Sequence, residues 1–321
     1  MNARANLDPD VQRRHNLRNL LQTVILIVGT AALASAIAWV TFGPSGLIWA
    51  AAFGAIGIWF LGRASPRMVL RLYKARELAD HEVPELHDLM RTLAKRADLQ
   101  AVPRLYYVPS QMLNAFAVGN SADSAVAVTD GLLRIMNLRQ LAGIMAHEVS
   151  HIRNGDLRVM GLADVLNRIT GFMSTLGLLG IPLLLGTGWD IPIVGLLLLI
   201  FAPTIGGLLQ LALSRAREYD ADLDGATLTG DPEGLASALA LLERKQGGAW
   251  EGLILPGSRL PEPSILRTHP KTADRIERLL ALRHEATMAI PLAETRTATA
   301  SSLVPPVRPP RIHWQRLGIW Y

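Results

Sequence analysis

The sequence of 321 residues contains no cysteine. This absence excludes disulfide bonds, thiolate metal ligands and cysteine nucleophiles, and it is compatible with a reducing compartment. Aromatic residues are also scarce, at 6% of the chain, and no basic cluster is interleaved with them. The pattern therefore gives no indication of a nucleic-acid partner.

Half of the residues are hydrophobic, 18% are charged, and the mean hydropathy is +0.25. A typical soluble protein is less apolar, so this composition indicates membrane spans joined to a polar domain. The formal net charge is +5. In a membrane protein, such an excess of basic residues more often sets the orientation of the chain than binds nucleic acid.

Two apolar runs near the N-terminus predict a transmembrane hairpin. Leu20–Phe42 carries no charge and is long enough to cross a bilayer as a helix. The turn GPSG at 43–46 leads into a shorter uncharged run, Leu47–Leu61. A signal peptide is the alternative, because basic residues precede the first run and Ala34-Ser35-Ala36 resembles a cleavage site. The apolar run continues past that site, which favours an uncleaved span.

A second pair of apolar runs, Ile169–Gly188 and Ile191–Leu213, predicts another hairpin. Pro182, Pro192 and Pro203 lie within or beside these runs and disfavour straight helices. The second hairpin therefore either spans the bilayer fully, which we favour, or is buried or partly re-entrant.

Basic residues flank both hairpins, whereas the turns within the hairpins carry none. Those after the first hairpin, with no acidic residue among them, are Arg63, Arg67, Arg71, Lys74 and Arg76. Those beside the second hairpin are Arg158, Arg168, Arg215 and Arg217. Because cytoplasmic loops carry an excess of basic residues, we expect the ends of both hairpins to face the cytoplasm.

The polar segments predict a folded domain in two parts. A strand is expected at Arg104–Val108, and Ala115–Val118 with Ala125–Thr129 reads as a β-hairpin. Helical spacing appears in ELADHEVPELHDLMRTLAKRADL, residues 77–99. Asp231 and Pro232 are typical of the start of a further helix. The predicted fold class is a mainly α membrane protein with a small β-sheet.

The predicted order along the chain is a cytoplasmic basic tail (1–19), the first hairpin (20–62), the first part of the folded domain (63–168), the second hairpin (169–213), the second part (214–285) and a disordered or extended Pro-rich tail (286–321).

A candidate site lies in LAGIMAHEVSHIRNGD, where His147, Glu148 and His151 form the pattern H-E-x-x-H. Two histidines four positions apart on a helix share one face and can bind one metal ion. Glu148 projects beside them, from where it can reach a metal-bound water. Two histidines that share a helix without a metal are the alternative.

Local signals support the helix that this site requires. Asn137 and Gln140 have the spacing of a capping box, and Asn154-Gly155 is a stop signal, so we predict one helix from 138 to about 153. The longer motif with a third histidine is excluded, because Leu157 stands at that position.

A catalytic zinc has three protein ligands, so a carboxylate elsewhere must complete the set. The best candidates lie in SRAREYDAD, residues 214–222, on a helix that continues from the last apolar run. Glu218 can bind the metal, and Asp222, one turn later, can accept a hydrogen bond from a ligand histidine. Spacing alone leaves Asp220 and Asp222 as rivals of Glu218.

Six stretches, together with the order of the apolar runs, resemble the HtpX-type membrane zinc metalloproteases, which are gluzincins related to the CaaX prenyl endopeptidases. The stretches, in the order of that family, are NAFAVG, VAVTDGLL, LAGIMAHEVSHIRNGD, SRAREYDADLDGA, DPEGLASAL and THPKTADRI. The resemblance covers most of residues 20–285. It implies a gluzincin-type protease domain, interrupted by a transmembrane helical hairpin.

The resemblance implies that one zinc ion per chain is bound by His147, His151 and Glu218, with Glu148 as the catalytic base. It implies that Asp222 orients a ligand.

It further implies that Asn114 and the following Ala115, Phe116 and Ala117 form an edge to which substrate adds as an extended segment. His269 and Arg275 are placed near the site, where they can stabilise the oxyanion. Taken without the resemblance, His269 is a helix-start residue and Arg275 is a surface arginine.

The family implies polypeptide substrates, among them membrane or misfolded proteins, and a multi-pass location in the inner membrane of a bacterial-type cell. Glu218 lies five positions beyond Leu213, about 7–8 Å along a helix, which places the zinc near the cytoplasmic membrane surface. A membrane protein with a non-catalytic metal site is a rival hypothesis, against which the intact Glu148 argues. A specialised CaaX-type processing enzyme is another.

Overall fold

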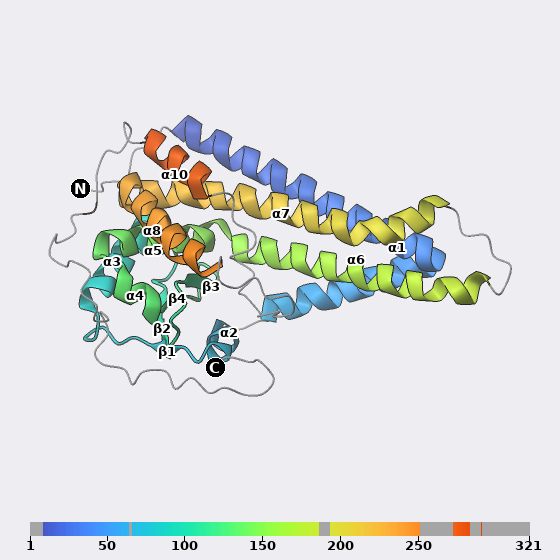
Figure 1. The fold of residues 1–321 in the computed structure, drawn as a ribbon, viewed down its shortest axis with the longest axis horizontal. Helices are drawn as coiled ribbons and strands as arrows, with labels where there is room; N and C mark the ends of the chain where they lie inside the picture. Colours follow the sequence, from blue (N-terminus) through green and yellow to red (C-terminus); the bar gives the residue numbers. More distant parts are fainter. Residues whose placement is uncertain (1–8, 64–65, 186–192, 251–271, 283–289, 291–321) are drawn as a thin grey trace. The chain divides into compact units, whose positions relative to one another are not determined.

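The computed structural model describes residues 9–63, 66–185, 193–250, 272–282 and 290 (Figure 1). The chain divides into two compact units. The sheet unit combines Ser65–Gly155 with the chain from Glu218 onward, and the helical unit combines Pro9–Ala64 with Asp156–Arg217. His269 and nearly all of the predicted Pro-rich tail lie outside the described residues.

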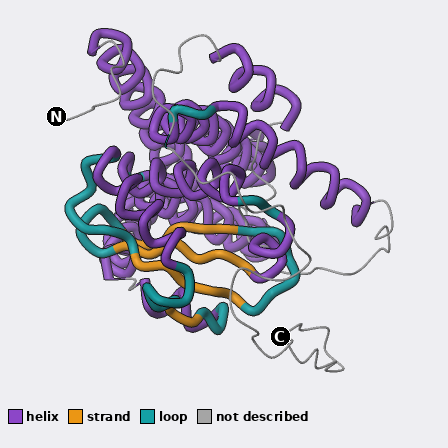
Figure 2. Tube along the Cα trace, turned by 90° about the vertical axis from the view of Figure 1, so that its left-hand side faces the viewer, coloured by secondary structure: helices purple, strands orange, loops and turns teal. Residues whose placement is uncertain are grey.

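The sheet unit is built on one sheet, whose strands are orange in Figure 2. The sheet has four strands in the order β1-β2-β4-β3. Its strands are β1 (Arg76–Glu77), β2 (Arg104–Val108), β3 (Ala115–Gly119) and β4 (Ser124–Thr129). Strands β2 and β4 are parallel, whereas β3 pairs with β4 as the predicted antiparallel hairpin. Strand β3 is therefore an edge strand of the described sheet.

Both faces of the sheet are buried. On one face, Tyr106, Phe116 and Ala127 form a cluster with Leu70 of the short helix α2 (Pro66–Leu72). Alternation along the strands turns Leu105 and the other intervening residues to the opposite face, where they are equally buried. This two-sided burial explains why the strands are continuous apolar runs.

Helices complete the sheet unit: α3 (Pro84–Arg96), α4 (Asp130–Ile135), α5 (Leu138–Asn154), the end of α7 (Ile193–Thr229), α8 (Pro232–Trp250) and α10 (Thr272–Ala281). The helical spacing predicted over 77–99 is wrong for its first part. Arg76 and Glu77 instead pair with β2, and the helix begins at Pro84, whose fixed φ suits a first helical turn.

Helix α5 is capped at both ends as the sequence predicts. The Asn137 side chain accepts a hydrogen bond from the Gln140 N–H at 2.9 Å, and the Gln140 side chain accepts one from the Asn137 N–H at 3.2 Å. Gly155 ends the helix with a φ of 69°, a left-handed conformation that favours glycine. The fixed ends leave His147 and His151 inside a regular helix.

The starts of α5 and α8 are tied together. Asp231 accepts a hydrogen bond from the Gly234 N–H at 3.0 Å, which confirms it as the cap of α8. Arg139 of α5 donates two hydrogen bonds to the Asp231 carboxylate, at 2.5 and 2.7 Å. One aspartate therefore caps one helix and anchors the other.

The helical unit contains α1 (Pro9–Arg63), α6 (Asp156–Leu185) and the first part of α7. Helix α1 breaks at Gly43 (φ 61°, ψ −145°), within the turn GPSG, and continues after Pro44. Helix α1 packs along α6. A cluster of Ile37, Met173, Leu199 and Ala202 draws on all three helices.

A buried ion pair lies within the helical unit. Arg217 donates a hydrogen bond to Asp156 at 2.9 Å and a second to the Thr23 hydroxyl. The side chains are almost fully buried, so the pairing offsets the cost of removing both charges from water. It joins α7, α6 and α1 through polar contacts.

Among the described residues, two helices are long and apolar enough to cross a membrane, at Leu20–Val40 and Ile193–Thr229. Phe42–Gly57 is a shorter apolar helix. Residues 186–192, where the second hairpin is predicted to turn, lie outside the described ranges.

Helices α5 and α8 approach closely at Gly143, where a Cβ atom would lie 2.8 Å from the Leu235 Cα and 2.9 Å from its backbone nitrogen. We expect Gly143→Ala to lower the unfolding free energy by about 1–3 kcal/mol, because the backbones must separate. Thermal unfolding of the purified protein in detergent measures this change. Gly171→Ala is the control, since a Cβ there meets nothing within 4 Å among the described atoms. Equal unfolding temperatures for the two variants would contradict the expectation.

Candidate metal centre

Two imidazoles of α5 face each other across one helical turn. The Nε2 atoms of His147 and His151 are 3.2 Å apart, and the ring planes are perpendicular. His147 is buried and His151 is half-buried. Two Nε2 atoms that both lack a proton, or that both carry one, repel each other at this distance, so the contact requires one proton or a cation between the two nitrogens.

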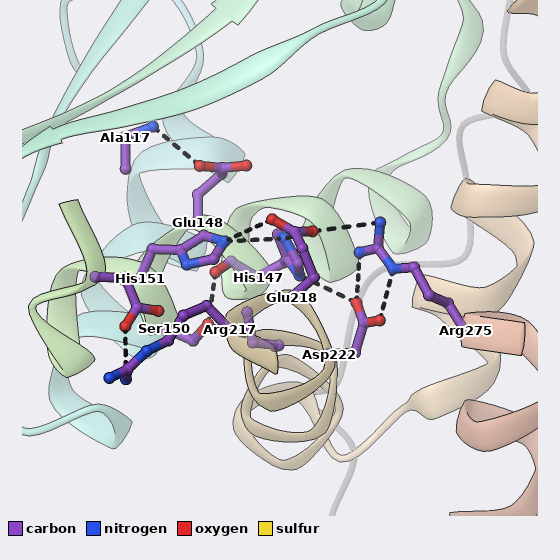
Figure 3. A network of polar contacts seen from close by, with 11 residues as sticks. Ala117, His147, Glu148, Ser150, His151, Arg217, Glu218, Asp222 and Arg275 are labelled. Atoms are coloured by element: carbon purple, nitrogen blue, oxygen red, sulfur yellow. Dashed lines mark hydrogen bonds and ion pairs between the residues drawn. The ribbon is translucent and has the colours of Figure 1, made fainter. Parts of the chain in front are cut away.

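Glu218 of α7 completes the group. Its Oε2 lies 3.5 Å from the His147 Nε2, and its Oε1 lies 3.6 Å from the His151 Nε2. These three residues form a group that can hold a metal ion, with ligand atoms all within 4.8 Å of one another. Figure 3 shows the three side chains converging from the two helices.

The donor atoms of the group fit zinc. Tetrahedral coordination with zinc–nitrogen and zinc–oxygen bonds near 2.1 Å separates the ligand atoms by about 3.3–3.5 Å. The two Nε2 atoms are 3.2 Å apart, and each lies 3.5 or 3.6 Å from a different oxygen of Glu218. With one ligand atom from each residue, the separations within the group extend to 4.8 Å. Two imidazoles and one carboxylate also form a donor set that catalytic zinc uses.

Close packing holds α7 against α5 at this point. A Cβ on Gly225 would lie 3.1 Å from the His147 backbone nitrogen, so the glycine permits the approach. The Ser150 hydroxyl donates to the His147 carbonyl at 2.7 Å and lies 3.4 Å from the Ala221 carbonyl. The backbones that carry the two ligand sets are therefore in direct contact.

Asp222 and Arg275 lie behind the group. The Asp222 Oδ1 is 3.1 Å from the His147 Nδ1, where a carboxylate can fix the imidazole so that its Nε2 faces the metal position. Arg275 of α10 donates two hydrogen bonds to Asp222, both at 2.7 Å, and its Nη1 is 3.4 Å from Glu218. All of these side chains are buried. Arg275 is thus a buried partner of the two carboxylates, not the surface arginine that the residues alone suggested.

The pKa values of His147 and Asp222 are shifted by the charged groups that surround them. Burial opposes charge on His147, but Asp222 and Glu218 outweigh it and raise its pKa to about 10. Burial likewise acts against the Asp222 carboxylate, yet Arg275 and His147 lower its pKa below the usual value. Without a metal, the carboxylates hold a proton on His147, so the position favours positive charge.

Glu148 takes a different direction from the same helix. Its Oε2 accepts a hydrogen bond from the Ala117 N–H of β3 at 2.9 Å (Figure 3). The contact with β3 was not predicted from the sequence. In an antiparallel hairpin, successive residues direct their backbone N–H groups alternately toward and away from the partner strand. This alternation is the sequence signal that could have indicated which N–H groups of β3 point away from β4.

The other predicted residues are placed as follows. Asn114 precedes β3, and its carbonyl accepts hydrogen bonds from the Thr129 N–H and hydroxyl, at 3.1 and 2.9 Å. Ala115, Phe116 and Ala117 lie on the edge strand. In the described part of the chain, the group that can hold a metal includes neither of the rivals of Glu218, Asp220 and Asp222.

A histidine pair with an adjacent glutamate on one helix, completed by a carboxylate from a second helix, defines a metallopeptidase type of site. Residues 80–283 match the model of peptidase family M48. This match covers more than half of the chain, which therefore belongs to peptidase family M48.

Two relatives that are covered almost completely by this chain support the assignment. The chain is 33% identical over 293 residues to a "Protease HtpX homolog" of Methylibium petroleiphilum, covering 82% of this chain and 98% of the relative. It is 37% identical over 281 residues to one of Thermococcus sibiricus, covering 81% and 94%. The structure titled "Crystal Structure of S. mikatae Ste24p" is 19% identical, with a TM-score of 0.48, covering 83% of this chain and 66% of that one.

The family and its relatives confirm the predicted class: the protein is a membrane metallopeptidase that hydrolyses peptide bonds in polypeptide substrates. The predicted fold class, mainly helical with one small sheet, is confirmed as well.

Asp222→Asn tests how the histidine is oriented. We expect the affinity for zinc to fall about 10–100-fold, because the amide is a weaker partner for the His147 imidazole than the carboxylate. Titration with zinc against a competing chelator measures this affinity. Asp224→Asn is the control: it lies on the same helix and accepts a hydrogen bond from Asn154 at 2.8 Å, outside the metal group. Unchanged affinity in Asp222→Asn would refute the role of Asp222.

Proposed function

We propose that the protein is a zinc endopeptidase that acts at the cytoplasmic face of the membrane, with His147, His151 and Glu218 as ligands and Glu148 as general base. The observation that carries the proposal is the convergence of two imidazoles of α5 and the Glu218 carboxylate of α7 into one group whose ligand atoms lie within 4.8 Å of one another. Bound there, zinc supplies Lewis-acid chemistry, which makes water more acidic and polarises a carbonyl.

Glu148 handles the proton in the proposed reaction. Its carboxylate accepts one proton from the water whose oxygen attacks the scissile carbonyl carbon. It then delivers that proton to the departing amide nitrogen as the carbon–nitrogen bond breaks. The hydrogen bond from the Ala117 N–H orients the carboxylate beside β3, so the proton acceptor and the edge strand are adjacent.

The proposed substrate position is the edge of β3 that faces away from β4, where the Ala117 N–H already donates to Glu148 and the other backbone groups can pair with a peptide. Asn114 and Asn120 pair toward β4 and its turn, as the hydrogen bonds of 3.1 Å to Thr129 and 2.9 Å to Asp123 show. Alternation then directs the backbone groups of Ala115 and Ala117 away from β4. An extended peptide can pair with this edge through its main chain, which gives weak dependence on substrate sequence.

Arg275 has a proposed role close to the ligands. The resemblance implies that Arg275 and His269 lie where they can stabilise the oxyanion, and the proposal retains His269 for that role. The contacts of Arg275 with Asp222 and Glu218 favour a positioning role, in which the guanidinium keeps both carboxylates ionised and in place.

The proposed orientation rests on the basic residues beside the hairpins, and the proposed substrate class rests on the short distance along α7 between its apolar segment and Glu218. Basic residues flank the apolar hairpins on their outer sides, which supports cytoplasmic termini in a multi-pass protein. Helix α7 carries both an apolar segment and Glu218, five residues after Leu213. A site so close to the end of an apolar segment suits membrane proteins, their juxtamembrane loops or misfolded chains near the bilayer.

Glu148→Gln separates chemistry from metal binding. We expect the variant to retain zinc and to lose cleavage of an unfolded model protein by a factor of about 10²–10⁴, since the amide cannot accept the proton. Glu218→Ala, in contrast, should lose stoichiometric zinc. Zinc content and cleavage rate are measured on purified protein, with the exposed Glu277→Gln of α10 as the control. Equal cleavage by wild type and Glu148→Gln would exclude the proposed base.

The orientation is tested by reporters fused after Tyr321. A fluorescent protein that matures in the cytoplasm should be bright, whereas alkaline phosphatase, which requires an oxidising compartment, should be inactive. The same reporters in the Gly43–Gly46 turn should give the opposite pattern. A C-terminal fusion that is active only outside the cytoplasm would contradict the proposed topology.

A further inference from the structure

Helix α2 is a short helix with one side buried in the sheet unit. Leu70 is 2% exposed and joins the cluster that contains Phe116 of β3, and Val69 packs against the same cluster. The ring of Tyr73, the residue after α2, lies 4.9 Å from the Phe116 ring. These contacts fix which side of α2 faces away from the sheet.

The side of α2 that faces away is both apolar and basic. Met68 and Leu72 are 56% and 77% exposed, and their spacing of four places them one above the other on the helix. Arg67 and Arg71 have the same spacing and form an exposed stripe beside them. Single exposed apolar residues are ordinary, but an apolar stripe bordered by a basic stripe is typical of a helix in a membrane interface.

The position of α2 in the chain supports the same interpretation. Two residues separate Pro66 from Arg63, the end of α1, and three Cα–Cα steps span at most about 11 Å. The stretch from Arg63 to Arg76 contains five basic residues and no acidic one. A segment with this charge, tethered closely to an apolar helix, complements an anionic bilayer surface.

We propose that α2 is an interfacial helix that binds anionic lipid. Met68 and Leu72 insert their side chains at the level of the acyl-chain boundary, and Arg67 and Arg71 contact the lipid phosphates. The long arginine side chains reach outward to the headgroups while their stems cover apolar surface.

Because α2 contacts β3, lipid binding by the apolar and basic side of α2 also affects the strand beside the metal group. Because Leu70 shares a core cluster with Phe116 and the Tyr73 ring lies against the Phe116 ring, lipid binding by α2 holds the edge strand beside the bilayer. This consequence rests on the proposed role of β3 in substrate binding, whereas lipid binding by α2 does not. The experiment below detects lipid contact directly and does not depend on proteolysis.

Because the chain lacks cysteine, an introduced cysteine is its only thiol. The full-length protein with Leu72→Cys, labelled with an environment-sensitive fluorophore, is reconstituted into vesicles that contain lipids with brominated acyl chains. We expect strong quenching in phosphatidylglycerol vesicles and weaker quenching in phosphatidylcholine. The control is Val102→Cys, a residue of similar type that is 50% exposed between α3 and β2. Equal quenching at positions 72 and 102 overturns the proposal. Equal quenching at position 72 in phosphatidylglycerol and phosphatidylcholine vesicles overturns it as well.

The basic stripe is tested in the Leu72→Cys background. Arg67→Gln with Arg71→Gln should lower the equilibrium constant for insertion into phosphatidylglycerol vesicles roughly thirtyfold, from the loss of two arginine–surface interactions. The matched control is Arg91→Gln with Lys95→Gln, two exposed basic residues with the same spacing on α3, which should leave quenching unchanged. Equal quenching in both double variants overturns the proposal. A label that is shielded from water without quenching by brominated lipid indicates a protein partner instead, and overturns it too.

Discussion

The arrangement of the site depends on two buried carboxylates that stand one turn apart on α7. Glu218 and Asp222 would repel each other strongly in this environment, so positive charge must be placed beside them. Arg275 supplies one such charge, through its paired hydrogen bonds to Asp222 and its approach to Glu218. One negative charge remains, and the two carboxylates raise the pKa of His147 against the effect of burial, which favours a proton on its imidazole. A divalent cation at the Nε2 atoms and Glu218 would replace that proton and leave the histidine neutral, which is the form that binds metals.

Helix α7 lets adjacent residues serve different partners. Successive side chains on an α-helix differ in direction by about 100°. Arg217 can therefore pair with Asp156 and Thr23 in the helical unit, while Glu218, the next residue, belongs to the metal group of the sheet unit. The ion pair of Arg217 also compensates one of the basic charges used to predict orientation. In the basic stretch after the first hairpin, Arg76 is likewise paired, with Glu82 at 2.8 Å.

Features with local signals could be predicted from the sequence. The capping box of Asn137 and Gln140, the stop at Gly155 and the β3–β4 hairpin depend on residues that are neighbours in the chain. The bidentate pair of Arg275 and Asp222 joins residues 53 positions apart, and no periodicity distinguishes such an arginine from one on a solvated face. The contact of Ala117 with Glu148 likewise depends on how the hairpin docks on α5, which is a matter of tertiary packing.

The register of this hairpin connects the proposed base with the proposed substrate position. The N–H of Ala117 reaches Glu148 because alternation turns it away from β4. A shift of one residue would turn that N–H into the ladder and present the N–H of Phe116 or Val118 at the edge, with the side chains exchanged between faces. Gly119, with a φ of 101° and no space for a Cβ beside Asp123, sets the turn from which the register is counted. A conformational requirement at the tip of the hairpin therefore determines which backbone groups meet the carboxylate and which stay available for an added strand.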